Sequence, residues 1–166
     1  MQSRDQTSRP AVRGVDYIRQ AQHHGYCCQI VALLNAALHL GATRLPQGED
    51  WLRLLSVARC RYCPPDWERV QAAADWLGLI LRDVPAELSE IRDSLPVMIM
   101  IPTRYVHPHA ALIVGVEGEQ VRLVNYSGLE GTEVVETRPF EVLRITRATS
   151  IIMTEKATKE FAVQQI

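Results

Sequence analysis

Residues 22–40 of this chain read QHHGYCCQIVALLNAALHL, and this stretch decides the fold. After a polar beginning, the residues from Cys28 to Leu40 are apolar nearly all round, not along one stripe, and Gly41 follows as a stop signal. A helix that is apolar on every side has to be buried. The segment therefore predicts a central helix with Cys28 at its start.

Helical spacing of apolar residues continues at 49–58 and 66–77, where Asp66 is the expected N-cap. Later in the chain the pattern changes to short, β-branched and apolar runs bounded by turn residues. These patterns predict strands at 15–20, 79–84, 97–101, 109–116, 120–126 and 150–154, and short helices at 85–95 and 139–146. Helices thus cluster in the first half and strands in the second. The fold class that follows is α+β, with a helical layer packed on a mostly antiparallel sheet.

Length and composition allow one such domain. The chain has 166 residues, of which 47% are hydrophobic and 22% charged, which suffices for a single core. We expect a flexible N-terminal tail at 1–14, one catalytic domain at 15–156 and a polar C-terminal tail at 157–166.

The charge balance and hydropathy exclude several classes of partner. A formal net charge of -1 does not favour binding to nucleic acid or to an anionic membrane. No apolar run reaches the roughly 20 residues that span a bilayer, and the first residues lack the pattern of a secretory signal. We therefore expect a cytoplasmic protein without a nucleic-acid or membrane partner.

The four cysteines form two pairs that are each close together in the sequence, Cys27 with Cys28 and Cys60 with Cys63. This layout is not that of a small secreted domain held by disulfides, so we expect reduced thiols. Cys60 and Cys63 have the spacing of half a zinc site, but no second CxxC or HxxxH completes the four ligands. Two buried structural thiols fit this pair better, and no metal is expected.

Cys28 and His109 are the residues that we expect to carry chemistry. A cysteine attacks a carbonyl group as the thiolate, and the N-terminus of a helix favours that anion through its unpaired N–H groups and its dipole. Cys28 is placed there, which predicts a lowered thiol pKa. His109 begins an apolar strand and can act as the base. Taken alone, each residue is more easily explained as a structural one, Cys28 in the core and His109 in a turn or the core.

The order Gln22, Cys28, His109 and Asn125 resembles that of papain-like cysteine peptidases, most closely the compact peptidases that process bacteriocins with double-glycine leaders. The resemblance spans about residues 17–154 and is carried by segments 22–36, 109–116 and 121–126. It implies that Gln22 donates a hydrogen bond to the oxyanion and that Cys28 attacks the carbonyl carbon. His109 would transfer the proton, and the side-chain oxygen of Asn125 would orient the imidazole. A peptide or protein substrate and no cofactor are implied.

Two residues depart from that pattern. Gln29 follows the nucleophile where the leader-processing peptidases commonly have Gly, and Cys27 directly precedes it as an alternative nucleophile. Cys28 is favoured because it keeps the spacing to Gln22. The same fold and acyl-enzyme also allow deamidation or acyl transfer, and an inactive domain that binds a peptide is a further alternative. The oligomeric state is not predicted.

The hairpin that joins the strands of His109 and Asn125 supplies a geometric test. Side chains alternate faces along a strand, so the length of the turn decides whether these two residues share a face. A two-residue turn at 117–118 would separate them, whereas a three-residue turn at 117–119 would bring them to one face. A Cys-His-Asn site therefore predicts an odd-length turn or a β-bulge near Gly118.

Overall fold

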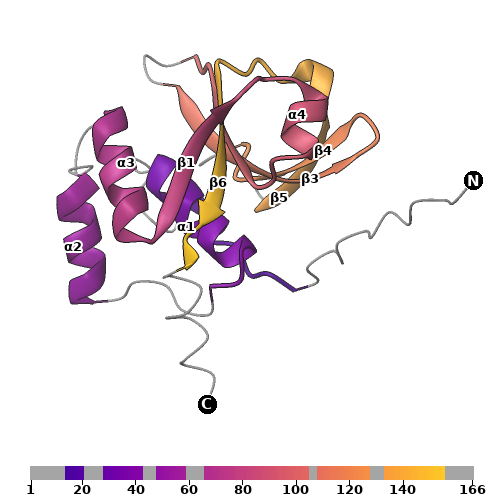
Figure 1. The fold of residues 1–166 in the computed structure, drawn as a ribbon. Helices are drawn as coiled ribbons and strands as arrows, with labels where there is room; N and C mark the ends of the chain where they lie inside the picture. The colour runs from indigo at the N-terminus through magenta and orange to yellow at the C-terminus, as the bar shows by residue number, and fades with distance from the viewer. Residues whose placement is uncertain are drawn as a thin grey trace, which may run out of the picture.

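A computed structural model describes residues 14–20, 28–42, 48–58, 66–104, 108–127 and 133–155. Its helices are α1 (Cys28–His39), α2 (Glu49–Ala58), α3 (Trp67–Trp76) and α4 (Leu88–Arg92), with a 3-10 turn η2 at Phe140–Val142. Its strands are β1 (Leu79–Val84), β2 (Val97–Ile101), β3 (His109–Glu117), β4 (Gln120–Val124), β5 (Val135–Pro139) and β6 (Arg147–Met153). Figure 1 shows the first three helices beside the sheet and α4 apart from them.

The strands form one six-stranded sheet in the order β1-β6-β2-β3-β4-β5. All of its pairings are antiparallel. Strand β2 reads VMIMI and is buried along its whole length, because both faces of the sheet are covered at this point. The helices and the antiparallel sheet confirm the predicted α+β fold.

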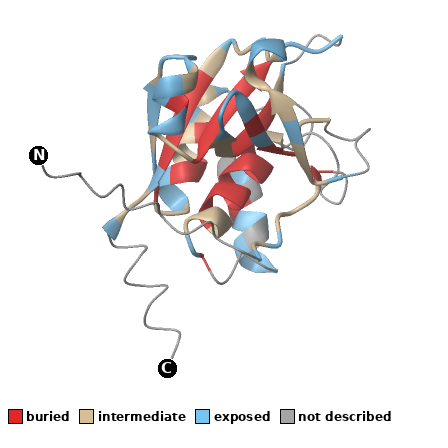
Figure 2. Ribbon diagram, turned by 90° about the vertical axis from the view of Figure 1, so that its right-hand side faces the viewer, coloured by how far each residue is buried: buried red, intermediate tan, exposed pale blue. Residues whose placement is uncertain are grey.

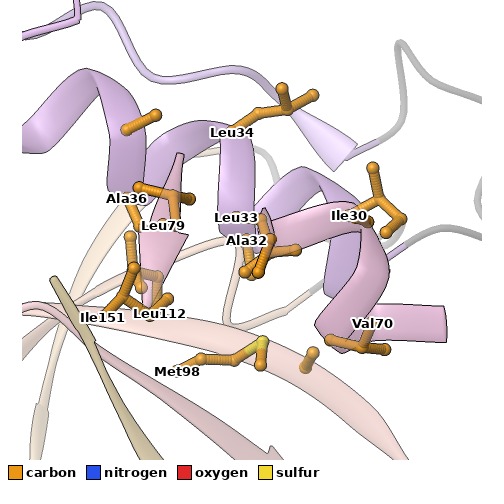
Figure 3. Close-up of a cluster of buried hydrophobic side chains, with 14 of the residues drawn as sticks. Ile30, Ala32, Leu33, Leu34, Ala36, Val70, Leu79, Met98, Leu112 and Ile151 are labelled. Atoms are coloured by element: carbon orange, nitrogen blue, oxygen red, sulfur yellow. The ribbon is translucent and has the colours of Figure 1, made fainter. Parts of the chain in front are cut away.

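One face of the sheet carries the central helix. Nine of the residues of α1 are buried, which confirms that this helix lies in the core (Figure 2). Removing a Leu or Ile side chain from water contributes roughly 1.5–3 kcal/mol, so a helix buried to this extent has one stable position on the sheet. Figure 3 shows the apolar cluster on this side of the sheet, whose labelled members are Ile30, Ala32, Leu33, Leu34, Ala36, Val70, Leu79, Met98, Leu112 and Ile151.

The opposite face carries α4 and the η2 turn. The side chains on this face alternate with those that contact α1, as expected for strands that are covered on both sides. Its buried members are Ile91, Val97, Ile99, Ile101, Ala111, Ile113, Val121, Leu123 and Ala148. The sheet is therefore held rigidly between two apolar layers, and the first residues of α1 and β3 have fixed positions on it.

The helix boundaries follow the predicted signals. Gly41 has a φ of 104°, a left-handed conformation that glycine adopts without steric cost, and it ends α1. The Asp66 side chain accepts a hydrogen bond from the main-chain N–H of Arg69, which confirms it as the N-cap of α3.

Two predicted elements are wrong. Residues 15–20 form no strand; 15–19 have no regular secondary structure, and the main chain of Ile18 and Gln20 is hydrogen-bonded by asparagine side chains. The helix predicted at 139–146 is only the short turn η2, which follows the unpredicted edge strand β5. Pro139 ends that strand, and the main-chain N–H of Thr146 then donates to Met100 on β2, which leaves no room for further helical turns.

The turn of the β3–β4 hairpin has two residues and not three. Glu117 pairs with Gln120, which leaves Gly118 and Glu119 in the turn. Gly118 has a φ of 59°, and a positive φ at the first central position is typical of the tight turns that join twisted strands. The odd-length turn that was one of our two expectations is therefore absent.

The other expectation, a β-bulge, is confirmed, although it lies further from the turn. The register shifts at Val114, and beyond it Leu112 pairs with Val124. If this pairing is extended by one residue, Asn125 lies opposite Ala111. Ala111 is two residues from His109, so His109 and Asn125 are on the same side of the hairpin. The unshifted register would have placed them on opposite sides. A single extra residue thus compensates for the even turn.

Candidate active site

Cys28 is the first residue of α1 and is partly buried between this helix and β3. Its sulfur accepts a hydrogen bond from the main-chain N–H of Ala110 at 3.4 Å. Ala110 follows His109 directly, so the thiol lies against the beginning of the strand that His109 starts. Sequence elements 82 residues apart are joined by this contact.

His109 is held by a main-chain carbonyl group. Its Nε2 atom lies 2.6 Å from the main-chain oxygen of Asn125. A carbonyl oxygen only accepts hydrogen bonds, so Nε2 has to carry the proton. The neutral imidazole consequently has its free lone pair on Nδ1, which is the form that a general base requires.

Asn125 contributes to the site differently from what the resemblance implies. Its side-chain oxygen accepts from the main-chain N–H of Gln20 at 3.0 Å, and its side-chain nitrogen donates to the carbonyl of Ile18 at 2.8 Å. The side chain therefore binds the segment before the nucleophile, and the main chain of the same residue contacts His109. Asn125 has a φ of 58°, and asparagine is among the few residues that adopt this conformation readily.

Asn35 holds the same segment from the other side. It is completely buried in α1, its side-chain oxygen accepts from the Ile18 N–H at 2.7 Å, and its side-chain nitrogen donates to the Ile18 carbonyl at 3.1 Å. Ile18 is thus bound by one amide from the helical layer and one from Asn125 at the end of β4. We call Asn35, Asn125 and the main chain of 18–20 the asparagine clasp.

The asparagine clasp was not predicted from sequence. Asn35 is a polar residue within an otherwise apolar helix, and a buried polar side chain usually has a structural or functional partner. That signal was available. The partner of Asn35 could not be predicted, because Ile18 contributes only main-chain groups and no sequence pattern marks them.

Burial determines the protonation of the catalytic candidates. It raises the pKa of the Cys28 thiol above 9.0, although N–H groups of Ala110, Gln29 and Cys28 itself lower it in part. Burial also lowers the pKa of His109 below 6.5, against an opposing contribution from its hydrogen bond to Asn125. The lowered thiol pKa that the helix start predicts is therefore outweighed by desolvation. Both shifts favour the neutral thiol and the neutral imidazole near neutral pH.

Two buried glutamines near the site have unpaired amide atoms. Among the described residues, the buried side-chain nitrogen and oxygen atoms without a hydrogen-bond partner belong to Gln20 and Gln29. Leaving a buried polar atom unpaired costs about 1–3 kcal/mol, so such atoms need an explanation. Both glutamines border the residues discussed above, since Gln29 follows Cys28 and Gln20 binds Asn125.

Other predicted residues fall outside the described part of the chain. These are Gln22, Cys27, Cys60 and Cys63. Within the described ranges, no group of three or more His, Cys, Asp or Glu side chains is arranged to hold a metal ion. No helix within these same ranges has the length and hydropathy needed to cross a membrane.

Comparison with solved structures identifies the fold. The chain is similar to the peptidase domain of Streptococcus ComA, described as a bifunctional ABC transporter involved in a quorum-sensing pathway, with a TM-score of 0.59 and 16% identity over 76% of this chain and 90% of that one. It also matches the N-terminal peptidase C39-like domain of a toxin-secretion ATP-binding protein from Vibrio parahaemolyticus, with a TM-score of 0.48 and 17% identity over 74% and 97% of the two chains. No family model and no curated protein sequence matches. The likeness to the ComA domain shows that this chain has the fold of that peptidase domain, in agreement with the papain-like fold that its sequence predicts.

Proposed function

We propose that this protein is a cysteine peptidase that hydrolyses a peptide bond through an acyl-enzyme on Cys28. His109 removes the thiol proton through Nδ1 while the sulfur forms a bond to the carbonyl carbon of the substrate. The tetrahedral intermediate then collapses, the C–N bond breaks, and the imidazolium returns the proton to the leaving amine. Water, activated by the same imidazole, releases the acid and restores the thiol.

The contact between His109 Nε2 and the Asn125 carbonyl carries this proposal. It selects the tautomer whose Nδ1 can accept a proton, and it stabilises the imidazolium that forms during attack. The contact between the Cys28 sulfur and Ala110 supports the pairing, because it brings the thiol to the strand on which His109 lies. Gln22 is proposed as the side chain that donates to the oxyanion, together with N–H groups at the start of α1.

A labelling experiment tests the proposal. The chain is treated at neutral pH with a mixture of tripeptidyl chloromethyl ketones of random sequence, in which the thiolate displaces chloride. We expect modification at Cys28, none at that position in Cys28→Ala, and a rate reduced by roughly 10²-fold or more in His109→Ala. Equal rates in the His109→Ala variant would refute the base role, and absence of labelling in the unmodified protein would favour a peptide-binding domain.

Product analysis then separates the possible reactions. The protein is incubated with a diverse peptide library, and the products are identified by mass spectrometry. New peptide termini that depend on Cys28 are expected from hydrolysis. Conversion of Gln or Asn to the acid without chain cleavage would instead assign a deamidase, and transfer of the acyl group to an added amine would assign a transferase.

The pH dependence of activity follows from the two neutral groups. Only neutral His109 can accept the thiol proton, so kcat/KM should rise with pH through the pKa of the imidazole, which burial lowers from its ordinary value. A thiolate-imidazolium pair would behave differently, because alkylation of Cys28 by iodoacetamide would then already be fast in mild acid. Here we expect iodoacetamide alkylation to keep increasing above pH 9.0. A plateau in the alkylation rate below pH 7 would contradict the neutral pair.

A further inference from the structure

We infer that Gln29 is a substrate-binding residue whose side-chain oxygen accepts a hydrogen bond from a main-chain N–H of the bound peptide. The inference rests on the function proposed above and extends it to a residue for which the peptidase mechanism has no role. It starts from the unpaired side-chain oxygen of Gln29, which is buried without a partner in a side chain that is only 8% exposed. Almost all buried polar atoms in native proteins are paired, so the partner of this one is expected to be supplied from outside the chain.

Gln29 is the neighbour of the nucleophile in the chain. Gln29 follows Cys28 in the first turn of α1, and its amide nitrogen lies 3.9 Å from the sulfur of Met100. Met100 pairs with Ala110 across β2 and β3, and Ala110 is the residue whose N–H contacts the Cys28 sulfur. Gln29 and Cys28 are therefore joined to neighbouring strands at one place in the sheet, where Met100 pairs with Ala110.

The amide is only weakly held where it lies. Its one hydrogen bond goes to a thioether, which is a poor acceptor, and its oxygen has none. Little is lost when such a side chain turns toward a ligand. A peptide laid across Cys28 carries an N–H group at every residue other than proline, and an N–H is what the free oxygen lacks.

Gln20 has unpaired amide atoms as well, but the same role does not follow for it. It is 1% exposed, and its own main chain is fixed by Asn125 in the asparagine clasp. Gln29 is less deeply buried and adjoins the nucleophile. The binding role is therefore assigned to Gln29 alone.

Replacement of Gln29 by Met separates a binding role from a structural one. Met has a similar length, no hydrogen-bond donor and only a weak acceptor, so removal of an unpaired buried amide should leave the Tm unchanged or raise it. Asn35→Leu is the matched control, because this buried amide has both of its atoms paired and its loss should lower the Tm by roughly 5 °C or more. A fall in the Tm of Gln29→Met as large as that of Asn35→Leu would overturn the inference.

Peptide recognition is measured with two versions of the tripeptidyl chloromethyl ketone mixture, one unmodified and one methylated at its backbone nitrogens. The unmodified protein should label faster with the first, and Gln29→Met should reduce this preference by about 10-fold, the factor expected for loss of one hydrogen bond of roughly 1.4 kcal/mol. Iodoacetamide, which has no peptide backbone, should alkylate both proteins at equal rates. An unchanged preference in Gln29→Met would refute the inference alone, whereas failure of the unmodified protein to label would refute both it and the proposed function.

Discussion

Asn125→Asp is expected to lower the free energy of unfolding by about 2–4 kcal/mol, although it changes only one non-hydrogen atom. The side-chain nitrogen of Asn125 donates to the carbonyl of Ile18 at 2.8 Å, and Asp would place a second acceptor against that oxygen. Asn125 is 6% exposed, so a carboxylate there would also lose most of its hydration. Urea denaturation of the two proteins measures the difference.

Asn125→Gly is the control that separates the main chain of this residue from its side chain. Gly adopts a φ of 58° without strain and keeps the carbonyl group that binds His109, so the folded variant should label at Cys28 within about 10-fold of the unmodified rate. If instead the side-chain oxygen oriented the imidazole, Asp would preserve that acceptor and Gly would remove it. The opposite ranking, with Asp active and Gly inactive, would therefore contradict the geometry described here.

His109→Ala is expected to reduce kcat/KM for peptide cleavage by roughly 10²- to 10⁴-fold, the range that general-base catalysis usually contributes. The variant lacks the acceptor for the thiol proton, and the raised pKa of Cys28 leaves little thiolate near neutral pH to react without help. Cleavage of a peptide identified from the library, followed at neutral pH, provides the measurement.

His39 offers a matched control for that substitution. It is another partly buried histidine whose pKa is lowered mainly by burial, but it lies at the far end of α1 from Cys28 and bonds the hydroxyl of Tyr17 at 2.8 Å. His39→Ala should lose this contact and some stability while keeping kcat/KM within about threefold, as expected for a side chain that does not touch the substrate. A similar loss of activity in both variants would show that the effect of His109→Ala is structural.

The elements of the fold that depend on local periodicity could be predicted from the sequence. A few neighbouring residues suffice to predict three of these elements: the apolar helix α1, the Asp66 N-cap and the apolar strand β2. Strand β5 could not be found in this way, because its sequence VETRP is polar and only partly buried, and it is paired along one edge alone. Its existence depends on β4, to which it is hydrogen-bonded.

The candidate site shows a similar limit. Cys28, His109 and Asn125 could be chosen from the sequence because their residue types and order have chemical meaning. The atoms that each residue uses could not, since the Asn125 carbonyl contacts His109 and the Asn125 side chain contacts a segment 107 residues away. The thiol pKa was predicted in the wrong direction because helix position was visible in the sequence and the depth of burial was not.

Because of the bulge at Val114, the number of residues in the hairpin decides which side of it each end faces. Because one extra residue reverses the alternation of β3 against β4, removal of a single residue anywhere between positions 109 and 125 would turn the two ends of the hairpin to opposite sides. A second insertion or deletion of one residue would bring the two ends back to the same side. During evolution, related chains should therefore tolerate insertions and deletions in this hairpin mainly as compensating pairs, while single changes would be removed by selection even where the turn itself is fully exposed to solvent.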